Sequence, residues 1–202
     1  MIDFSRTTIL FGGSFDPIHA GHLHVAKHAL AALPGAQLVF VPAQQSPGKH
    51  PPVASPAERL AWLEKAVAAG IFQVWDAELK RDGVSYTVDT LLQAHGAGAR
   101  RENLYWLVGA DAYATFPAWK DPARIRALAK LLVVNRPGSP IEAQDAEDLI
   151  VEIPPHPASS TALRAALAAG QEAPEEIPAP VNEELGKLLL LGRNPYARGI
   201  SK

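Results

Sequence analysis

A short apolar run that stops at two glycines constrains the fold of this chain more than any other feature. Residues 7–11 are apolar or β-branched and predict a buried strand, which Gly12 and Gly13 end. Apolar side chains then recur at helical spacing, at Leu23, Ala26, Leu30 and Leu33. We therefore expect a strand, a glycine turn and a helix that begins near Ala20 or Gly21.

Two histidines follow the glycine turn. His19 and His22 stand three residues apart, so they project to one side of the helix start, and Gly21 leaves the backbone between them open. A strand that leads through glycines into a helix places the free N–H groups of the helix against a phosphate. A single histidine near a helix start is usually a polar surface residue. The combination favours a site that stabilises a polyphosphate as its charge redistributes.

Length and composition limit the class of protein. The 202 residues fit one domain, 1–202, and 48% hydrophobic with 20% charged residues is typical of a globular chain. A formal net charge of −2 argues against a general binder of nucleic acid or membrane surfaces. The chain has no cysteine, which excludes disulfides, thiolate zinc sites and cysteine nucleophiles and fits the cytoplasm. No apolar run reaches transmembrane length, and Asp3 and Arg6 interrupt any signal-peptide pattern.

Strand and helix patterns alternate along the chain. Further strands are predicted at 37–41, 72–76, 103–108, 131–134 and 149–153, and further helices at 56–67, 88–95, 122–129, 162–169 and 182–191. Residues 43–54 and 139–148 are expected to be exposed loops. This alternation predicts an α/β fold with a single Rossmann-like, doubly wound parallel sheet. The core is expected within residues 7–169, with a small helical C-terminal portion at 170–202.

A second candidate motif precedes the helix at 162–169. Ser159, Ser160 and Thr161 are small hydroxyl residues, and Arg164 follows one turn later. Such residues are good N-caps, so a well-capped helix explains them without any ligand. The same run offers several N–H and O–H donors beside an arginine that can hold a phosphate by two hydrogen bonds.

The string Gly12–His22, GGSFDPIHAGH, resembles the opening of the bacterial nicotinate-nucleotide adenylyltransferases, a family of the HxGH nucleotidyltransferases. The run Ser159–Arg164, SSTALR, is similar to the family signature SSTxIR. The resemblance implies a catalytic role for His19, His22 and Arg164. It also implies that ATP is bound by Gly12, Gly13, Ser14, Phe15, Ser160 and Thr161.

The loop at 43–54 resembles the family loop in one position. The family carries a lysine or arginine after Pro-Pro-His, which reaches toward the phosphates. Here the stretch is Ser46–Lys49, so the basic residue is kept as Lys49 and the histidine is replaced by Gly48. The resemblance implies a catalytic role for Lys49, and His50 is a candidate replacement for the missing histidine.

The acceptor side of the expected site rests on three more stretches. Residues 81–91 resemble the family pattern R-D-G-x-S-Y-T-x-D-T-L, which implies that Ser85, Tyr86 and Thr87 receive the nicotinate carboxylate. Trp119 matches the tryptophan that stacks on the pyridine ring. Gly109 and Asp111 match an element that contacts ribose and phosphate, and Arg136 one that binds the phosphate of the mononucleotide.

The resemblance implies adenylyl transfer from ATP to nicotinate mononucleotide, giving deamido-NAD and pyrophosphate with phosphate-bound Mg²⁺. It extends from Thr8 to about Arg164, and no function is carried onto the C-terminal tail. Another HxGH transferase is the nearest alternative, acting on phosphopantetheine, flavin mononucleotide or a polyol phosphate. Nicotinamide mononucleotide stays open as the acceptor, because an amide and a carboxylate differ only in the donors and acceptors they need. A non-catalytic nucleotide-binding protein would share the fold.

Overall fold

A computed structural model describes residues 2–138, 141–171 and 175–199 of the chain. Its sheet holds six strands in the order β3-β2-β1-β4-β5-β6, and every neighbouring pair is parallel. The strands are β1 (Thr8–Gly13), β2 (Gln37–Pro42), β3 (Gln73–Val74), β4 (Leu104–Gly109), β5 (Lys130–Asn135) and β6 (Leu149–Glu152). This order is that of a doubly wound sheet, which confirms the predicted fold class.

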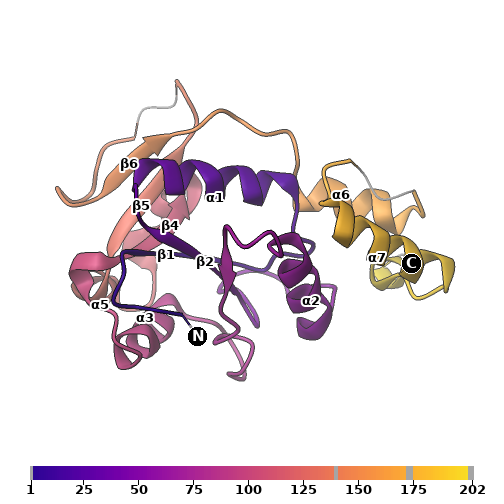
Figure 1. Ribbon diagram of the computed structural model, residues 1–202, viewed down its shortest axis with the longest axis horizontal. Helices are drawn as coiled ribbons and strands as arrows, with labels where there is room; N and C mark the ends of the chain where they lie inside the picture. The colour runs from indigo at the N-terminus through magenta and orange to yellow at the C-terminus, as the bar shows by residue number, and fades with distance from the viewer. Residues whose placement is uncertain (1, 139–140, 172–174, 200–202) are drawn as a thin grey trace.

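Helices cover both faces of the sheet. The α-helices are α1 (Ala20–Ala32), α2 (Pro56–Ala66), α3 (Thr87–Gly96), α4 (Ala110–Ala114), α5 (Pro122–Leu128), α6 (Ser160–Ala168) and α7 (Ala179–Leu190). Short 3₁₀ turns are η1 (Arg101–Asn103), η2 (Phe116–Ala118) and η3 (Pro195–Gly199). Figure 1 shows α1 on one face of the sheet and α3 with α5 on the other, while α6 and α7 lie together beside α2.

Two apolar cores follow from the alternation of side chains along the buried strands. Ile9 faces one core and Leu10 the other. The first core joins the sheet to α1, α2, α6 and α7, with Ala26, Trp62, Leu163, Leu167, Val181 and Leu185. The second joins it to α3, α4 and α5, with Val88, Leu91, Tyr113, Ile125 and Leu128. The four inner strands of the sheet, β2, β1, β4 and β5, are therefore covered on both faces.

Local sequence signals explain several helix starts. Ser55 caps α2 by accepting from the N–H of Glu58, and the Glu58 carboxylate accepts from the N–H of Ser55, with Pro56 as the first helical residue. The helix at 182–191 in fact begins at Ala179, because Pro180 is compatible with a first turn. The strand at 72–76 is shorter than predicted, since only Gln73 and Val74 pair with β2.

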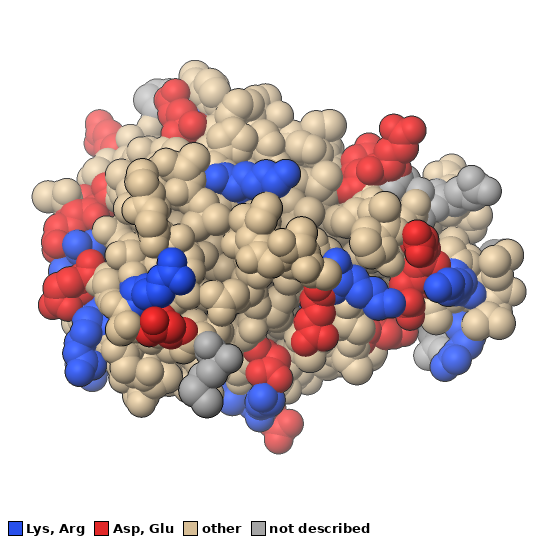
Figure 2. All heavy atoms as spheres, viewed as in Figure 1, with Lys and Arg blue, Asp and Glu red and all other residues tan. Residues whose placement is uncertain are grey.

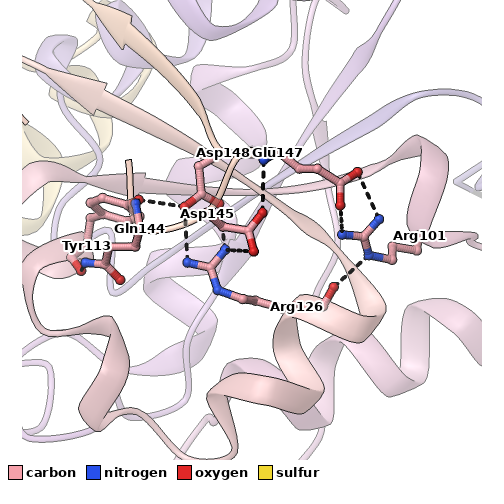
Figure 3. Close-up of polar contacts among 7 residues, drawn as sticks. All are labelled: Arg101, Tyr113, Arg126, Gln144, Asp145, Glu147 and Asp148. Carbon is pink, nitrogen blue, oxygen red and sulfur yellow. Dashed lines mark hydrogen bonds and ion pairs between the residues drawn. The ribbon is translucent and has the colours of Figure 1, made fainter. Parts of the chain in front are cut away.

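The segment predicted as a surface loop at 139–148 is attached to the body of the protein where the structure describes it. Residues 139 and 140 lie outside the described residues. Asp148 is almost fully buried and accepts from both Nη atoms of Arg126, at 2.8 and 3.1 Å, and from the Tyr113 hydroxyl at 2.6 Å (Figure 3). Arg101 holds Glu147 with both Nη atoms and donates from Nε to the Arg126 carbonyl (Figure 3). These side chains therefore form a polar cluster that joins α4 and α5 to the start of β6: Arg101, Tyr113, Arg126, Glu147 and Asp148. No periodic pattern in the sequence could reveal it.

The surface in Figure 2 mixes both signs of charge. Basic side chains on this face stand singly or beside acidic ones, and no large patch of either sign is visible. No helix among the described residues is long and apolar enough to cross a membrane.

Candidate active site

The candidate site lies where the strand order reverses. β1 and β4 are neighbours in the sheet, but the chain runs outward from them in opposite directions. In open parallel sheets, ligands bind outside the carboxyl ends of strands at such a point. The predicted motifs lie at these ends: Gly12 and Gly13 end β1, Gly109 ends β4, and Arg136 comes directly after β5.

The two glycines are required by packing inside the protein. A Cβ atom on Gly12 would lie 2.6 Å from Cζ2 of Trp106, and one on Gly13 would lie 2.9 Å from Cζ of Phe15. Phe15 itself has a positive φ of 48°, and its ring is buried beneath the turn. Gly12 and Gly13 are the last two residues of β1 and pair with β2, so the predicted glycine turn is wrong, and the chain turns only after them. Glycine is needed there because the strand packs closely against Trp106 and Phe15.

The structure brings the two predicted histidines into contact at the start of α1. The rings of His19 and His22 stack with centroids 3.7 Å apart and planes inclined by 27°. The N–H of His19 donates to Nδ1 of His22 at 3.3 Å, which fixes the second ring against the helix start. Nε2 of His19 lies 3.0 Å from Oγ of Ser160, the first residue of α6.

Burial keeps both imidazoles neutral. Burial, together with the neighbouring His156 and Arg164, lowers the pKa of His19 to about 4. Burial, together with His19 and Lys49, holds the pKa of His22 well below its usual value. A neutral imidazole carries one N–H donor and one acceptor. Nδ1 of His19 is buried and has no hydrogen-bond partner within the described part of the chain.

The second predicted motif lies directly against the first. Ser159 caps α6 by accepting from the N–H of Ala162 at 3.2 Å, as expected of an N-cap. Arg164 donates from Nη1 to the carbonyl of Asp16 at 2.9 Å and from Nη2 to Oγ1 of Thr161 at 3.3 Å. The free N–H groups at the start of α6 and the Arg164 guanidinium are thus presented beside the histidine pair.

A close backbone approach explains the glycine between the histidines. A Cβ atom on Gly21 would lie 3.0 Å from the His19 ring and 3.2 Å from the carbonyl oxygen of Ala158. A side chain at this position would therefore force the start of α1 and the segment before α6 apart by a few tenths of an ångström. The sequence predicted that Gly21 leaves the backbone between the histidines open, and the structure places the His19 ring and the segment just before the second motif there.

The loop at 43–54 carries Lys49 over the same edge. The loop returns to the end of β1 through the N–H of Ala43, which donates to the Gly13 carbonyl at 2.9 Å, and through Ser14 and Ser46, whose Oγ atoms are 3.1 Å apart. Lys49 is exposed, and its charge contributes to the lowered pKa of His22. The structure therefore places Lys49 near the histidine pair.

The expected acceptor residues lie around the start of α3 and beyond β4. Ser85 is buried, and its Oγ accepts from the Gln44 N–H at 3.0 Å, so this side chain holds the loop at 43–54. Tyr86 and Trp119 are half-buried, and both pack against the second core. Lys120, next to Trp119, places its ammonium 4.3 Å from the Tyr86 ring centroid, which brings these two stretches together.

The remaining predicted residues line the edge without contacting the histidines. Thr87 is half-buried as the first residue of α3. Gly109, Asp111 and Arg136 are exposed where β4 and β5 end.

Three residues that sequence reasoning did not select hold this site together. Asp16, Arg59 and Tyr196 are buried. Asp16 accepts from the loop at 43–54, Arg59 donates to that loop and to the Ser14 carbonyl, and Tyr196 donates to Asp16. Asp16 lies within the GGSFDPIHAGH string, so its position was available as a signal. Arg59 looks like an ordinary surface charge of α2, and Tyr196 lies in a tail with no recognisable motif.

Comparison with known proteins identifies the family. The sequence profile described as Cytidylyltransferase-like matches residues 10–166. A protein of Roseiflexus sp., described as a nicotinate-nucleotide adenylyltransferase, is 39% identical over 175 residues, covering 80% of this chain and 86% of the relative. One of Thermus thermophilus with the same description is 37% identical over 178 residues, covering 88% of this chain and 95% of the relative.

A solved structure supports the fold independently. The nicotinic acid mononucleotide adenylyltransferase of Plasmodium falciparum, in complex with NaAD, matches with a TM-score of 0.70 at 15% identity, covering 97% of this chain and 100% of that one. With the family profile spanning most of the chain and relatives alike over nearly their whole length, the chain belongs to the nicotinate-nucleotide adenylyltransferases, within the Cytidylyltransferase-like family.

Proposed function

We propose that this protein transfers the adenylyl group of ATP to nicotinate mononucleotide, giving deamido-NAD and pyrophosphate as a step of NAD biosynthesis. The observation that carries the proposal is the stacked pair of neutral histidines beside the start of α6, with Arg164 next to them. The family to which the chain belongs supports the reaction. The solved relative that is described in complex with NaAD supports the product, and a second one in complex with APC supports a nucleotide donor.

The chemistry requires no general base. A 5′-phosphate oxygen of nicotinate mononucleotide attacks the α-phosphorus of ATP, the new P–O bond forms, and the bond to the bridging oxygen of pyrophosphate breaks. The phosphate is already ionised at neutral pH, so no proton must be removed. Catalysis then consists of positioning and of stabilising charge on the transferred group and on the leaving pyrophosphate.

The donor groups of the site suit that task. His19 and His22 are neutral, so they meet the phosphates as N–H donors with no counter-ion to displace. Arg164 and Lys49 supply positive charge, and the first residues of α6, Ser160 and Thr161, supply free backbone N–H groups. The segment from Gly12 to Phe15, at the end of β1, is proposed to line the site beside them.

On the acceptor side, the pyridine ring of the mononucleotide would lie against Trp119. Tyr86 and Thr87 are at the start of α3, where a carboxylate is favoured over an amide by the helix dipole. Arg136, exposed beyond β5, is the proposed partner of the mononucleotide phosphate. Gly109 and Asp111 complete the edge toward the ribose.

Mg²⁺ is proposed to arrive bound to ATP. Within the described ranges no three or more His, Cys, Asp or Glu side chains are placed to hold a metal. Mg²⁺ usually keeps several waters and binds substrate phosphates, so these residues fit a metal carried by the nucleotide. When bound, Mg²⁺ neutralises part of the charge on the phosphates. We propose a cytoplasmic location, which the cysteine-free sequence fits.

Pyrophosphate release with ATP and Mg²⁺ tests the function, with nicotinate mononucleotide and nicotinamide mononucleotide compared at equal concentration. Strong preference for the acid is the expected result. His22→Ala should lower kcat by at least about a hundredfold, as loss of one preorganised donor does. His28→Ala, the same change six residues along α1, is the matched control and should keep activity. Absence of turnover with both acceptors would overturn the assignment to pyridine nucleotides.

A further inference from the structure

We infer that the C-terminal segment around Tyr196 is part of the catalytic apparatus, because its hydroxyl positions Asp16 and thereby both Arg164 and the loop that carries Lys49. This inference rests on the proposed function, since it assigns positioning residues to the same site. Neither the family signature motifs nor the resemblance of residues 8–164 reaches Tyr196. The argument starts from Asp16.

Asp16 is the point at which three separate segments meet. Its side chain is 3% exposed, and Oδ2 accepts from the Val53 N–H at 2.7 Å. Oδ1 accepts from the Ala54 N–H at 3.2 Å and from the Tyr196 hydroxyl at 2.8 Å. The backbone carbonyl of the same residue accepts from Nη1 of Arg164 at 2.9 Å. A displacement of the Asp16 backbone would therefore move the carboxylate that holds the end of the loop and the carbonyl that accepts from Arg164 together.

Arg59 fixes the same loop from its other side. The guanidinium is fully buried; Nη1 donates to the carbonyls of Ser14 at 2.7 Å and Ala43 at 2.8 Å, and Nε donates to that of Ala54 at 3.3 Å. Burial lowers the pKa of Arg59, and the charge of Asp16 partly restores it. The first and last residues of the loop are thus attached to the segment that follows β1, and Lys49 lies between the two attachments.

Tyr196 reaches Asp16 from the far end of the chain. The two residues are 180 positions apart, and the hydroxyl contact is buried. The segment before Tyr196 is fastened to α6, because Nδ2 of Asn194 donates to the Leu167 carbonyl at 2.7 Å and its Oδ1 accepts from the Tyr196 N–H at 2.9 Å. Burial and the charge of Asp16 raise the pKa of Tyr196, so the phenol stays a donor throughout the working range of pH.

Tyr196 touches none of the groups proposed to meet the phosphates, so it is a positioning residue. The Asp16 carboxylate accepts from two N–H groups and from the Tyr196 hydroxyl, so removing that hydroxyl leaves it buried with only the two N–H donors. The carboxylate is then free to turn, and displacements of about 1 Å at a site of this kind cost up to about a hundredfold in rate. Because two donors remain, we expect a loss of about tenfold in kcat/KM for ATP.

Tyr113→Phe is a matched control for Tyr196→Phe. Tyr113 is also a buried tyrosine whose hydroxyl donates to a buried aspartate, Asp148, at 2.6 Å. That hydrogen bond ends at Asp148, directly before the amino end of β6, and Tyr113 itself lies on α4, which follows the carboxyl end of β4. Both variants lose a tyrosine hydroxyl that donates to an aspartate, and the Tyr113 hydroxyl also accepts from the N–H of Gln144. Within the described residues, neither Tyr113 nor Asp148 is hydrogen-bonded to Asp16 or to the loop at 43–54.

The test compares steady-state pyrophosphate release and amide hydrogen exchange for the wild type and the two variants, well below their unfolding temperatures. We expect Tyr196→Phe to lower kcat/KM for ATP about tenfold and to speed exchange at the amides of Val53 and Ala54. Tyr113→Phe should stay within about twofold and leave those amides protected. If Tyr196→Phe does not fold, Asn194→Ala loosens the same segment with the phenol intact and carries the same expectation.

The outcomes separate the two proposals. Equal kinetics and equal exchange for Tyr196→Phe and Tyr113→Phe would overturn the positioning role while the wild type still released pyrophosphate. A wild type without pyrophosphate release would instead overturn the proposed function, and the exchange of Val53 and Ala54 would still report whether Tyr196 holds the loop.

Discussion

The substitution Gly12→Ala tests whether the end of β1 needs glycine for packing. The new Cβ would lie 2.6 Å from Cζ2 and 2.8 Å from Cη2 of Trp106. Carbon atoms in contact prefer about 3.5–4.0 Å, so the indole must retreat by about 1 Å. Trp106 is 5% exposed and packed within the second core, so it has little room. Overpacking of this kind costs about 1–3 kcal/mol in the free energy of unfolding.

Urea unfolding, followed by tryptophan fluorescence, measures the effect. With a slope of about 2 kcal/mol per molar urea, the midpoint should fall by about 0.5–1.5 M. Gly186→Ala is the control, because Gly186 lies inside α7 with open space where its Cβ would go. That change should stabilise the protein by about 0.5–1 kcal/mol, as alanine is the better helix former. An unchanged or higher midpoint for Gly12→Ala would refute the packing argument.

Two further predictions concern stability: the first its dependence on pH, the second the effect of a residue away from the site. The pKa of His19 is about 4 when folded and about 6.5 when unfolded, so between these values only the unfolded state binds a proton. The contribution of His19 to stability is therefore fully present above pH 6.5 and falls as the pH drops. Between pH 7.5 and pH 4.5, urea titrations should show that the free energy of unfolding falls by about 2–3 kcal/mol more in the wild type than in His19→Gln. Equal losses would count against a buried neutral His19. Asp148→Ala should lower the free energy of unfolding by about 2–3 kcal/mol, because it leaves the half-buried Arg126 without its main partner. The kcat should stay unchanged. A large fall in kcat would show that the polar cluster around Asp148 reaches the site.

Sequence reasoning located the elements and the signature residues because both are local. The strand that ends at Gly13, the helix start at His19 and the cap at Ser159 are written in runs of consecutive residues. A parallel sheet brings the carboxyl ends of its strands to one edge, so the approximate meeting of the first and last motifs followed from the fold class.

The contacts that hold the site together are of another kind. Asp16 with Tyr196, Arg59 with the loop carbonyls, and Arg126 with Asp148 join segments that are far apart in the chain. Each partner alone has an ordinary local interpretation: a charge on a helix, or a polar residue in a loop. Their pairing depends on how loops and tails fold back onto the sheet, which hydrophobic periodicity does not encode.

The bond between Tyr196 and Asp16 also bears on how the enzyme is made. A nascent chain that has left the ribosome through α6 already contains His19, His22, Lys49 and Arg164. It still lacks the hydroxyl that completes the hydrogen bonding of Asp16, which comes only with the turn η3. Two residues synthesised 180 positions apart must therefore meet before the enzyme can work at full rate. A protease that removes the turn η3 would slow the enzyme while leaving its sheet and its histidines in place.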